Sequence, residues 1–363
     1  MRYRGAGVEE DTPLVVLQSL RQVRPTTNPY LVMLVRALNA EPDVHVALFS
    51  YRRALFGSYD VFHVHWPEIL LGGPRTLRRV ARQVLLVAVL LRLTLSGTPV
   101  VRTLHNVARP EGLRWHEQRL LDWFDRRTRV VIRLNEHTPA PTGVPSVLVR
   151  HGHYRDWYAQ APREPAILGR IGYVGLIRRY KGVESLVEAF EDTSRSPVGV
   201  TLTLRIGGQP SSADLAERLR VAAERDDRIS VDLHFLDDAE LVEIVTQSSL
   251  VVLPYRFMHN SGGVLAALSL DRPVLVPDND VNRSLAREVG KGWVLTYEGN
   301  LRDEHLEDAL RQAKTRQGRP DLSAREWQRA APEHVAAYRL ASGHPTSAGS
   351  SRRPSASPLA EAS

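Results

Sequence analysis

The sequence predicts an α/β protein built from two successive parallel-sheet units. Its 363 residues suit two ordinary domains better than one. Short apolar segments alternate with stretches of helical periodicity, and this β-α-β rhythm indicates a parallel sheet with helices on both faces. The rhythm pauses at residues 138–154 and resumes after a proline-rich stretch at 161–166. We therefore expect two units of similar size that join near 150–165.

The first unit carries five expected strands and three expected helices. The helix at 28–40 has Asn28 as its N-cap and Pro29 at its first helical position, where proline needs no N–H partner. The other helices are expected at 75–95, which is long, and at 111–126, which is amphipathic. The expected strands are 13–20, 44–50, 60–66, 99–106 and 129–136.

The second unit repeats the pattern with six expected strands and helices between them. A last helix is expected at 323–341, with a kink at Pro332. The Ser/Pro/Ala/Gly-rich tail from 342 onward is expected to be disordered. The predicted divisions are 1–155, 166–322, a helix 323–341 that could cross back to the first domain, and the tail 342–363. The expected strands are 167–175, 200–208, 228–235, 249–255, 272–277 and 292–298.

The composition excludes several classes of function. The chain has no cysteine, which excludes disulfides, thiolate metal sites and thiol nucleophiles. The net charge of +7 suits a peripheral membrane protein as well as a nucleic-acid-binding one. The first twelve residues lack the apolar core of a signal peptide, and the longest apolar run, 84–95, is too short to span a bilayer. We expect a cytoplasmic protein that could attach to the inner face of the plasma membrane.

The turn after the first strand of the second unit concentrates positive charge. Gly175 allows a tight turn, Gly182 allows the next helix to begin close to a ligand, and Arg178, Arg179 and Lys181 lie between them. Arginine offers a planar fork to phosphate oxygens and lysine a compact charge. A solvated basic turn is the alternative. This turn predicts a site for a phosphate.

The turn at 255–263 follows another apolar strand of the same sheet. Asn260 and Ser261 are good N-cap residues, and Gly262 and Gly263 open the following helix. A helix N-terminus with glycines offers free N–H groups and the positive end of a dipole. Ordinary capping explains Ser261, but it does not explain two glycines that weaken the helix. The turn predicts a second anion site.

A third turn, residues 205–210, again contains paired glycines, Gly207 and Gly208. The carboxyl ends of parallel strands meet at one edge of a sheet, so the three turns should lie together. Together they predict a site for a nucleoside diphosphate. Tyr173 and Tyr255 are candidates to line the nucleotide pocket, with core packing as the alternative.

The first unit instead places histidines and carboxylates at strand ends. His63, His65 and Glu68 follow one strand, and His105 with Glu111 follows the next. A zinc site is the competing interpretation, but no compact ligand motif is present. The acidic residues at 278–280 fit helix capping better than metal binding. The domain junction carries His151, His153 and Tyr154.

These motifs resemble those of GT-B glycosyltransferases, in which two Rossmann-like domains face each other across a cleft. The resemblance covers about residues 13–340. In many of these enzymes a glycine precedes a Lys-Gly pair by six residues, and the lysine holds the donor diphosphate; Gly175, Lys181 and Gly182 match this spacing. The usual arginine after the glycine is replaced here by Leu176. The resemblance implies an acceptor domain at 1–155 and a nucleotide-sugar donor domain at 166–322.

One departure distinguishes the sequence from common retaining members of the family. The two glutamates that those enzymes carry eight positions apart are replaced by Met258 and Ala266. The segments 63–68, 103–106, 150–158 and 254–263 are closer to bacterial GDP-mannose-dependent mannosyltransferases of exopolysaccharide and glycolipid assembly. The resemblance implies transfer of mannose from GDP-mannose, or of another sugar from a UDP-sugar, to a carbohydrate or polyprenyl-linked acceptor.

The implied chemistry needs charge stabilisation and a base. The cationic turn and the glycine-led helix end would stabilise the leaving diphosphate, so no divalent metal or other cofactor is required. An inverting transfer also needs a base at the acceptor hydroxyl, for which Glu68 and His105 are candidates, with Glu111 behind them. In a retaining transfer, His105 would instead hydrogen-bond the donor sugar.

The helix at 75–95 suggests contact with an anionic membrane. Arg75, Arg78, Arg79 and Arg82 occupy its leading turns, and a broad apolar face follows. A core helix with a solvated basic end is the alternative. The rival functions are a nucleotide-sugar epimerase of the same fold, an inactive nucleotide-binding scaffold and, last, a nucleic-acid-binding protein, for which no known binding motif is present.

Overall fold

In the computed structural model, the described residues, 13–24, 26–72, 76–193 and 201–343, form two lobes, each with a parallel six-stranded sheet. The expected α/β class is thereby confirmed. The tail predicted to be disordered lies outside the described residues from 344 onward. The divisions drawn from the sequence stay a prediction.

The first lobe has the strand order β2-β1-β3-β4-β5-β6. Its strands are β1 Leu14–Gln18, β2 Val44–Leu48, β3 Val61–Val64, β4 Val100–Leu104, β5 Thr128–Arg133 and β6 Ser146–Leu148. Its helices are α1 Pro29–Asn39, α2 Tyr51–Phe56, α3 Pro67–Leu71, α4 Thr76–Ser96 and α5 Trp115–Arg127. The sequence did not predict α2, α3 or β6, because each is only three to six residues long. The expected start of α1 is confirmed, since the Asn28 side chain accepts a hydrogen bond from the Tyr30 N–H at 3.0 Å.

The second lobe has the order β12-β11-β10-β7-β8-β9, which is the doubly wound arrangement of dinucleotide-binding sheets. Its strands are β7 Arg170–Val174, β8 Thr203–Gly207, β9 Ile229–Asp232, β10 Leu250–Val252, β11 Val274–Pro277 and β12 Val294–Tyr297. Its helices are α6 Val183–Asp192, α7 Ala213–Arg225, α8 Asp238–Gln247, α9 Gly262–Ser269, α10 Asp280–Val289 and α11 Asp303–Ala313. The strand order reverses between β7 and β10, the point at which such sheets bind ligands.

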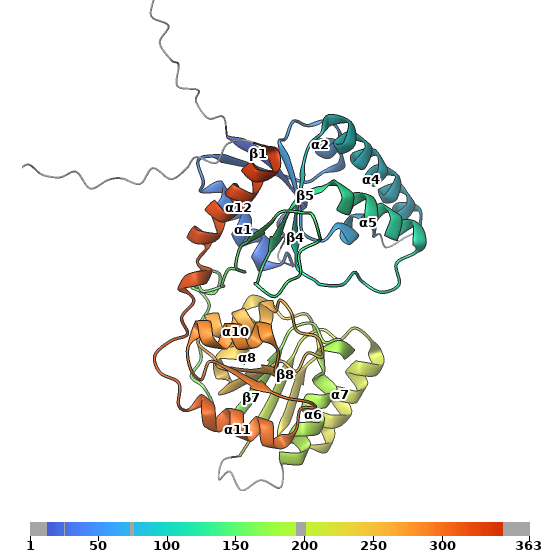
Figure 1. Ribbon diagram of the computed structural model, residues 1–363. Helices are drawn as coiled ribbons and strands as arrows, with labels where there is room; N and C mark the ends of the chain where they lie inside the picture. The colour runs from blue at the N-terminus through green and yellow to red at the C-terminus, as the bar shows by residue number, and fades with distance from the viewer. Residues whose placement is uncertain (1–12, 25, 73–75, 194–200, 344–363) are drawn as a thin grey trace, which may run out of the picture.

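The last helix, α12 Trp327–Ser342, returns to the first lobe. It packs against α1 and against β3 to β6, and Figure 1 shows it running from the second lobe along the flank of the first. The expected helix at 323–341 is divided, because a 3₁₀ turn at Ser323–Arg325 precedes α12. The helix continues past Pro332.

Buried apolar side chains form two clusters. One fills the α4 face of the first sheet, with Phe62, Leu86 and Phe124 at its centre. The other begins on the α1 and α12 face of that sheet and continues into the core of the second lobe, with Tyr30, Tyr173 and Trp327 among its members. Continuous apolar packing therefore joins the two lobes and holds the carboxyl ends of both sheets near each other (Figure 1).

Candidate functional site

The glycine turns of the second lobe meet at one cavity of about 540 Å³, which we call the glycine-rich cavity. Gly175 (φ +121°) and Gly208 (φ +150°) both adopt backbone conformations that favour glycine. A Cβ atom on Gly208 would lie 1.9 Å from the Gly175 carbonyl oxygen, so the first and third turns touch directly. The residues from the sequence-based prediction that line this cavity are Tyr154, Gly175, Lys181, Gly208, Tyr255, Gly262 and Gly263.

Two cations, Lys181 and Arg24, line this cavity, and Lys181 is the less exposed of the two. Its Nζ lies 4.8 Å from the centre of the Tyr255 ring and 3.7 Å from where a Cβ on Gly175 would stand. Burial, with a smaller contribution from the nearby Arg178 charge, lowers the pKa of Lys181 to about 8. No carboxylate in the described residues forms an ion pair with it. A partly buried cation without a carboxylate partner favours binding of an anion from solution.

The N-terminus of α9 also lines this cavity. Ser261 caps the helix by accepting a hydrogen bond from the Val264 N–H at 3.3 Å. The N–H groups of Gly262 and Gly263 belong to the first turn, which has no partners within the helix. A Cβ on Gly262 would come within 3.1 Å of the Tyr154 hydroxyl, so there is little room for a side chain at this position. Amide donors and a helix dipole thus face the same space as Lys181.

Six of the predicted diphosphate or nucleotide residues do not line this cavity: Arg178, Arg179, Tyr173, Gly207, Asn260 and Ser261. Arg178 and Arg179 are exposed, and Arg179 pairs with Asp214 at 2.8 Å. Tyr173 is fully buried in the core. A Cβ on Gly207 would stand 2.4 Å from the Ile244 side chain, so this glycine serves helix packing.

Asn260 connects the two lobes. Its side chain donates to the His105 carbonyl oxygen at 3.0 Å and accepts from the Asn135 amide at 2.8 Å. Next to it, the His259 ring lies 2.7 Å from the Thr138 hydroxyl. The turn that leads into α9 is therefore attached to the first lobe beyond the ends of β4 and β5.

Sequence reasoning missed several residues of the glycine-rich cavity. These come from the turn after β1, from the junction and from the turn after β9: Arg24, Thr26, Thr27, Asn28, Pro29, Trp157, Tyr158, Phe235, Leu236, Asp237 and Asp238. The Trp157 indole N–H donates to Asp238 at 3.0 Å, which links two of these segments. The turns after β1 and β9 both follow strands, and this position at the end of a strand is the feature of the sequence that could have identified them. They lack the paired glycines that drew attention to the other turns.

A smaller cavity of about 170 Å³, the His105 cavity, lies in the first lobe. Glu68 stands in the first turn of α3 and is half-buried. Burial raises its pKa, and the nearby Arg102, which itself pairs with Asp125, partly opposes the rise. Glu111 is exposed and lies outside this cavity. The Glu68 carboxylate is therefore accessible from the His105 cavity and has a raised pKa.

His105 lies in the same cavity in a crowded aromatic setting. Its ring stacks on Trp66 with 4.0 Å between ring centres, and its Nε2 lies 3.1 Å from His65 Nδ1. Burial lowers the pKa of His105 well below its ordinary value. The ring is consequently neutral near pH 7. Tyr30 packs edge-on against it at 5.2 Å and directly follows Asn28 and Pro29, which line the glycine-rich cavity. The two cavities are thus close neighbours.

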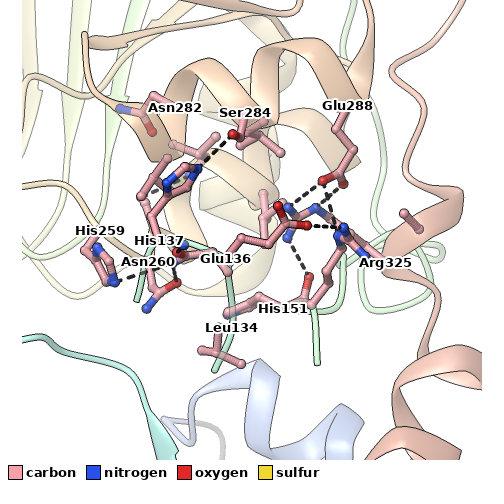
Figure 2. A pocket seen from close by; sticks show the side chains of 18 of the residues that line it. Leu134, Glu136, His137, His151, His259, Asn260, Asn282, Ser284, Glu288 and Arg325 are labelled. Carbon is pink, nitrogen blue, oxygen red and sulfur yellow. Dashed lines mark hydrogen bonds and ion pairs between the residues drawn. The ribbon is translucent and has the colours of Figure 1, made fainter. Parts of the chain in front are cut away.

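A third cavity of about 510 Å³ lies between the lobes on the other side of α9, and Ser261 is among its lining residues. Figure 2 shows His151 and Asn260 in this cavity. Arg325 binds Glu288 at 2.6 and 3.0 Å and donates to the His151 carbonyl oxygen at 3.2 Å. His151 Nδ1 donates to the Gly152 carbonyl oxygen at 2.8 Å, and burial lowers its pKa to about 4. Internal partners thus satisfy most charges here.

The other junction histidine, His153, is buried beside Glu326, with 3.0 Å between its Nε2 and the carboxylate. No three His, Cys, Asp or Glu side chains in the described part of the chain group closely enough to hold a metal ion. The glycine-rich cavity can therefore bind an anion through Lys181 and backbone N–H groups. The neighbouring His105 cavity offers a carboxylate of raised pKa, Glu68, and a neutral imidazole, His105.

Comparison with known proteins adds sequence relatives and solved structures. Residues 169–314 match the family model of group 1 glycosyl transferases. A GDP-mannose:glycolipid 4-beta-D-mannosyltransferase of Xanthomonas campestris pv. campestris is 43% identical over 334 residues, which are 91% of this chain and 93% of the relative.

Two solved structures share the fold at low identity. Anabaena HepE, solved with UDP and glucose, is 13% identical and superposes with a TM-score of 0.57 over 91% of this chain and 97% of its own. An Escherichia coli trehalose-6-phosphate protein, solved with UDP-2-fluoroglucose, is 10% identical, with a TM-score of 0.59 over 91% of this chain and 96% of its own. The expected GT-B architecture is confirmed.

Proposed function

The chain belongs to the group 1 glycosyltransferase family of its Xanthomonas relative, and we propose that it transfers mannose from GDP-mannose to the hydroxyl of a glycolipid acceptor. The observation that carries the proposal is Lys181, a partly buried cation that has no ion-pair partner among the described residues and lies in a cavity lined by glycines at the ends of parallel strands. The relative's name supports the choice of mannose, guanosine and a lipid-linked acceptor.

In this proposal the glycine-rich cavity holds the nucleotide sugar. The diphosphate binds Lys181 and the N–H groups of Gly262 and Gly263, while Gly175 and Gly208 allow it to approach the backbone. Arg178 adds positive potential from the rim, since its charge acts on Lys181. As the glycosidic bond breaks, the diphosphate gains negative charge. Donors already in place stabilise this charge without reorganisation.

The acceptor hydroxyl loses its proton on the side of the first lobe. We assign the base to Glu68, because its carboxylate is half-buried with a raised pKa and lies in the His105 cavity. The neutral His105 is the second candidate, with a lone pair available for a hydroxyl proton. Glu111 is the weakest of the three because it is exposed and outside the cavity.

The positions of the missing glutamates fit this division of roles. Ala266 lines the glycine-rich cavity, and Met258 is buried with its sulfur 3.4 Å from the Asn282 amide. Neither residue can bind sugar hydroxyls as a carboxylate does. The second lobe still brings two carboxylates to this cavity, but Asp237 accepts from the Glu240 N–H and Asp238 from the Trp157 indole. A carboxylate from the first lobe is therefore the better candidate, which favours a direct, inverting displacement.

We further propose that α4 rests on a membrane surface. Five apolar side chains, the α4 stripe, recur at helical spacing and are 48% to 87% exposed: Leu77, Val80, Val84, Leu91 and Leu95. Ile69, next to Glu68, and Val107, at the His105 cavity, are also exposed. A lipid-linked acceptor could then reach the proposed base without leaving the surface.

The arginines of this helix contribute less than the sequence suggested. Arg79 donates to the buried Glu117 at 2.7 Å, and Arg82 donates to the Gly72 carbonyl oxygen. Arg78 is exposed, and Arg75 lies outside the described residues. None of the described helices is long and apolar enough to cross a bilayer. Burial of the apolar stripe, assisted by Arg78, therefore supports attachment better than a cluster of cations does.

The proposal is tested with purified protein, nucleotides and acceptor. GDP should raise the melting temperature more than UDP does, since a ligand that binds only the folded state stabilises it. GDP-mannose and a glycolipid acceptor should give a mannosylated lipid and GDP. A changed sugar without acceptor would identify an epimerase, and nucleotide binding without turnover would identify an inactive scaffold. Either outcome would refute the transfer reaction, and a stronger response to UDP would refute the guanosine assignment.

A further inference from the structure

A chain of buried hydrogen bonds leads from the C-terminal helix to His105. Tyr338 of α12 lies 2.8 Å from His63 Nδ1 and accepts from the Gln18 amide at 3.1 Å. The carbonyl oxygen of the same Gln18 side chain lies 3.2 Å from His65 Nε2, and His65 Nδ1 lies 3.1 Å from His105 Nε2. All five side chains are at most 9% exposed. We call this series the histidine relay.

The relay fixes where each proton lies. An amide oxygen only accepts, so His65 Nε2 must carry the proton that Gln18 receives. A neutral ring has one N–H, so His65 Nδ1 is the acceptor of the next bond. His105 must therefore donate from Nε2. Its Nδ1 is left as a lone pair, and no group in the described residues bonds this atom while the ring lines the His105 cavity.

We propose that Gln18 and Tyr338 are positioning residues that hold His105 as the Nε2–H tautomer, so that its Nδ1 lone pair serves substrate hydroxyls. The inference rests on the proposed function for the role of His105, but the proton arrangement itself does not. In the structure the Gln18 amide nitrogen lies toward Tyr338 and His63, at 3.1 and 3.0 Å, and its oxygen lies toward His65, so the proton arrangement follows from this orientation of the amide. If this amide were reversed, every proton up to His105 would move to the other nitrogen.

This arrangement gives α12 a function beyond packing. Tyr338 follows Gln18 by 320 residues, so the last helix completes a network that begins at the first strand. The other ring nitrogen of His63, Nε2, lies 2.8 Å from the Thr103 hydroxyl. This contact holds the His63 ring with its Nδ1 toward Tyr338. For metal-bound histidines, removal of a partner that fixes the tautomer typically costs about 10- to 100-fold in metal affinity or activity, and we expect an effect of the same order here.

The test uses the full chain with ¹⁵N-labelled histidine rings. Proton–nitrogen correlation spectra distinguish protonated from bare ring nitrogens, and His105→Gln assigns the His105 signals by their loss. Wild type should show His105 protonated at Nε2. Gln18→Leu should mix the two tautomers and lower kcat roughly 10- to 100-fold with little change in the KM for GDP-mannose. Tyr338→Phe should act in the same direction but more weakly, because His63 still holds the amide.

Tyr30→Phe is the matched control. Tyr30 packs against both His65 and His105, yet its hydroxyl has no hydrogen-bond partner within the described ranges of the chain. This variant should leave the tautomer and kcat unchanged. A wild-type His105 protonated at Nδ1, or a Gln18→Leu spectrum identical to wild type, would overturn the proposal. A third outcome is that the tautomers change as predicted in Gln18→Leu while kcat stays at the wild-type value. This would remove His105 from the proposed reaction and leave the assignment of the nucleotide site unaffected.

Discussion

Replacing Lys181 with methionine tests whether this lysine binds the ligand or stabilises the fold. Methionine keeps the apolar stem over the Tyr255 ring and removes only the charge. We expect the variant to bind GDP more weakly while the free protein becomes no less stable. A lysine that stabilised the fold would give the opposite result for stability. Lys291→Met, at an exposed lysine, is the control.

The structure gives the size of both effects. Burial lowers the pKa of Lys181 from 10.5 to about 8, so the unpaired cation costs the free protein roughly 3 kcal/mol. Its contact with the Tyr255 ring returns about 0.5–2 kcal/mol of this. A hydrogen bond between a charged group and phosphate contributes about 1.5–3 kcal/mol. Its loss should weaken GDP binding roughly 10- to 150-fold.

Calorimetric titration with GDP and denaturant unfolding of the free protein measure these quantities. The diphosphate binds the protonated lysine, so wild-type affinity should fall as the pH rises above about 8. The unfolded chain holds the Lys181 proton up to its ordinary pKa. Wild-type stability should therefore gain relative to Lys181→Met between pH 8 and 10.5. Unchanged GDP affinity in Lys181→Met, with stability lost, would refute the assignment of the diphosphate to this cavity.

Three further predictions concern the base, the buried histidines and the membrane. Glu68→Gln should lower kcat by roughly 10²–10⁴ without changing GDP affinity, whereas a nearly normal kcat would point to His105. Three buried histidines have pKa values of about 3 to 4, below the ordinary 6.5; they are His65, His151 and His334. Their stabilisation is complete above pH 6.5 and is lost as the pH falls toward 4, so unfolding at pH 5.5 should need about 1.4 kcal/mol less per histidine than at pH 7.5. Serine at Leu77 or Leu91 of the α4 stripe should weaken binding to anionic vesicles roughly tenfold, and unchanged vesicle binding would remove the stripe from the proposal.

The sequence predicted the features that depend on local pattern. Alternating apolar segments predicted both sheets, because a parallel sheet covered on two faces demands that rhythm. The spacing of Gly175, Lys181 and Gly182 predicted a cationic turn, and the structure places the lysine and the first glycine at one cavity. The left-handed conformation of Gly182 (φ +66°), beside the Pro254 carbonyl, explains why that position needs glycine.

The features that escaped prediction depend on contacts between distant segments. Asn260 had the sequence of an N-cap, but Ser261 takes that role, and Asn260 reaches the carbonyl of His105. Arg179 had the charge for phosphate, but Asp214, 35 residues away, pairs with it. Gln18 and Tyr338 carry no motif at all. Only the three-dimensional arrangement brings them to the histidines.

The return of α12 to the first lobe has a consequence for synthesis on the ribosome. The half of the protein made first lacks one of its covering layers until the final segment has been translated, so apolar surface over β3 to β6 stays open throughout. Removal of some forty residues at the carboxyl end should therefore damage the amino-terminal half, and an isolated amino-terminal fragment should aggregate unless a peptide of residues 327–342 is supplied.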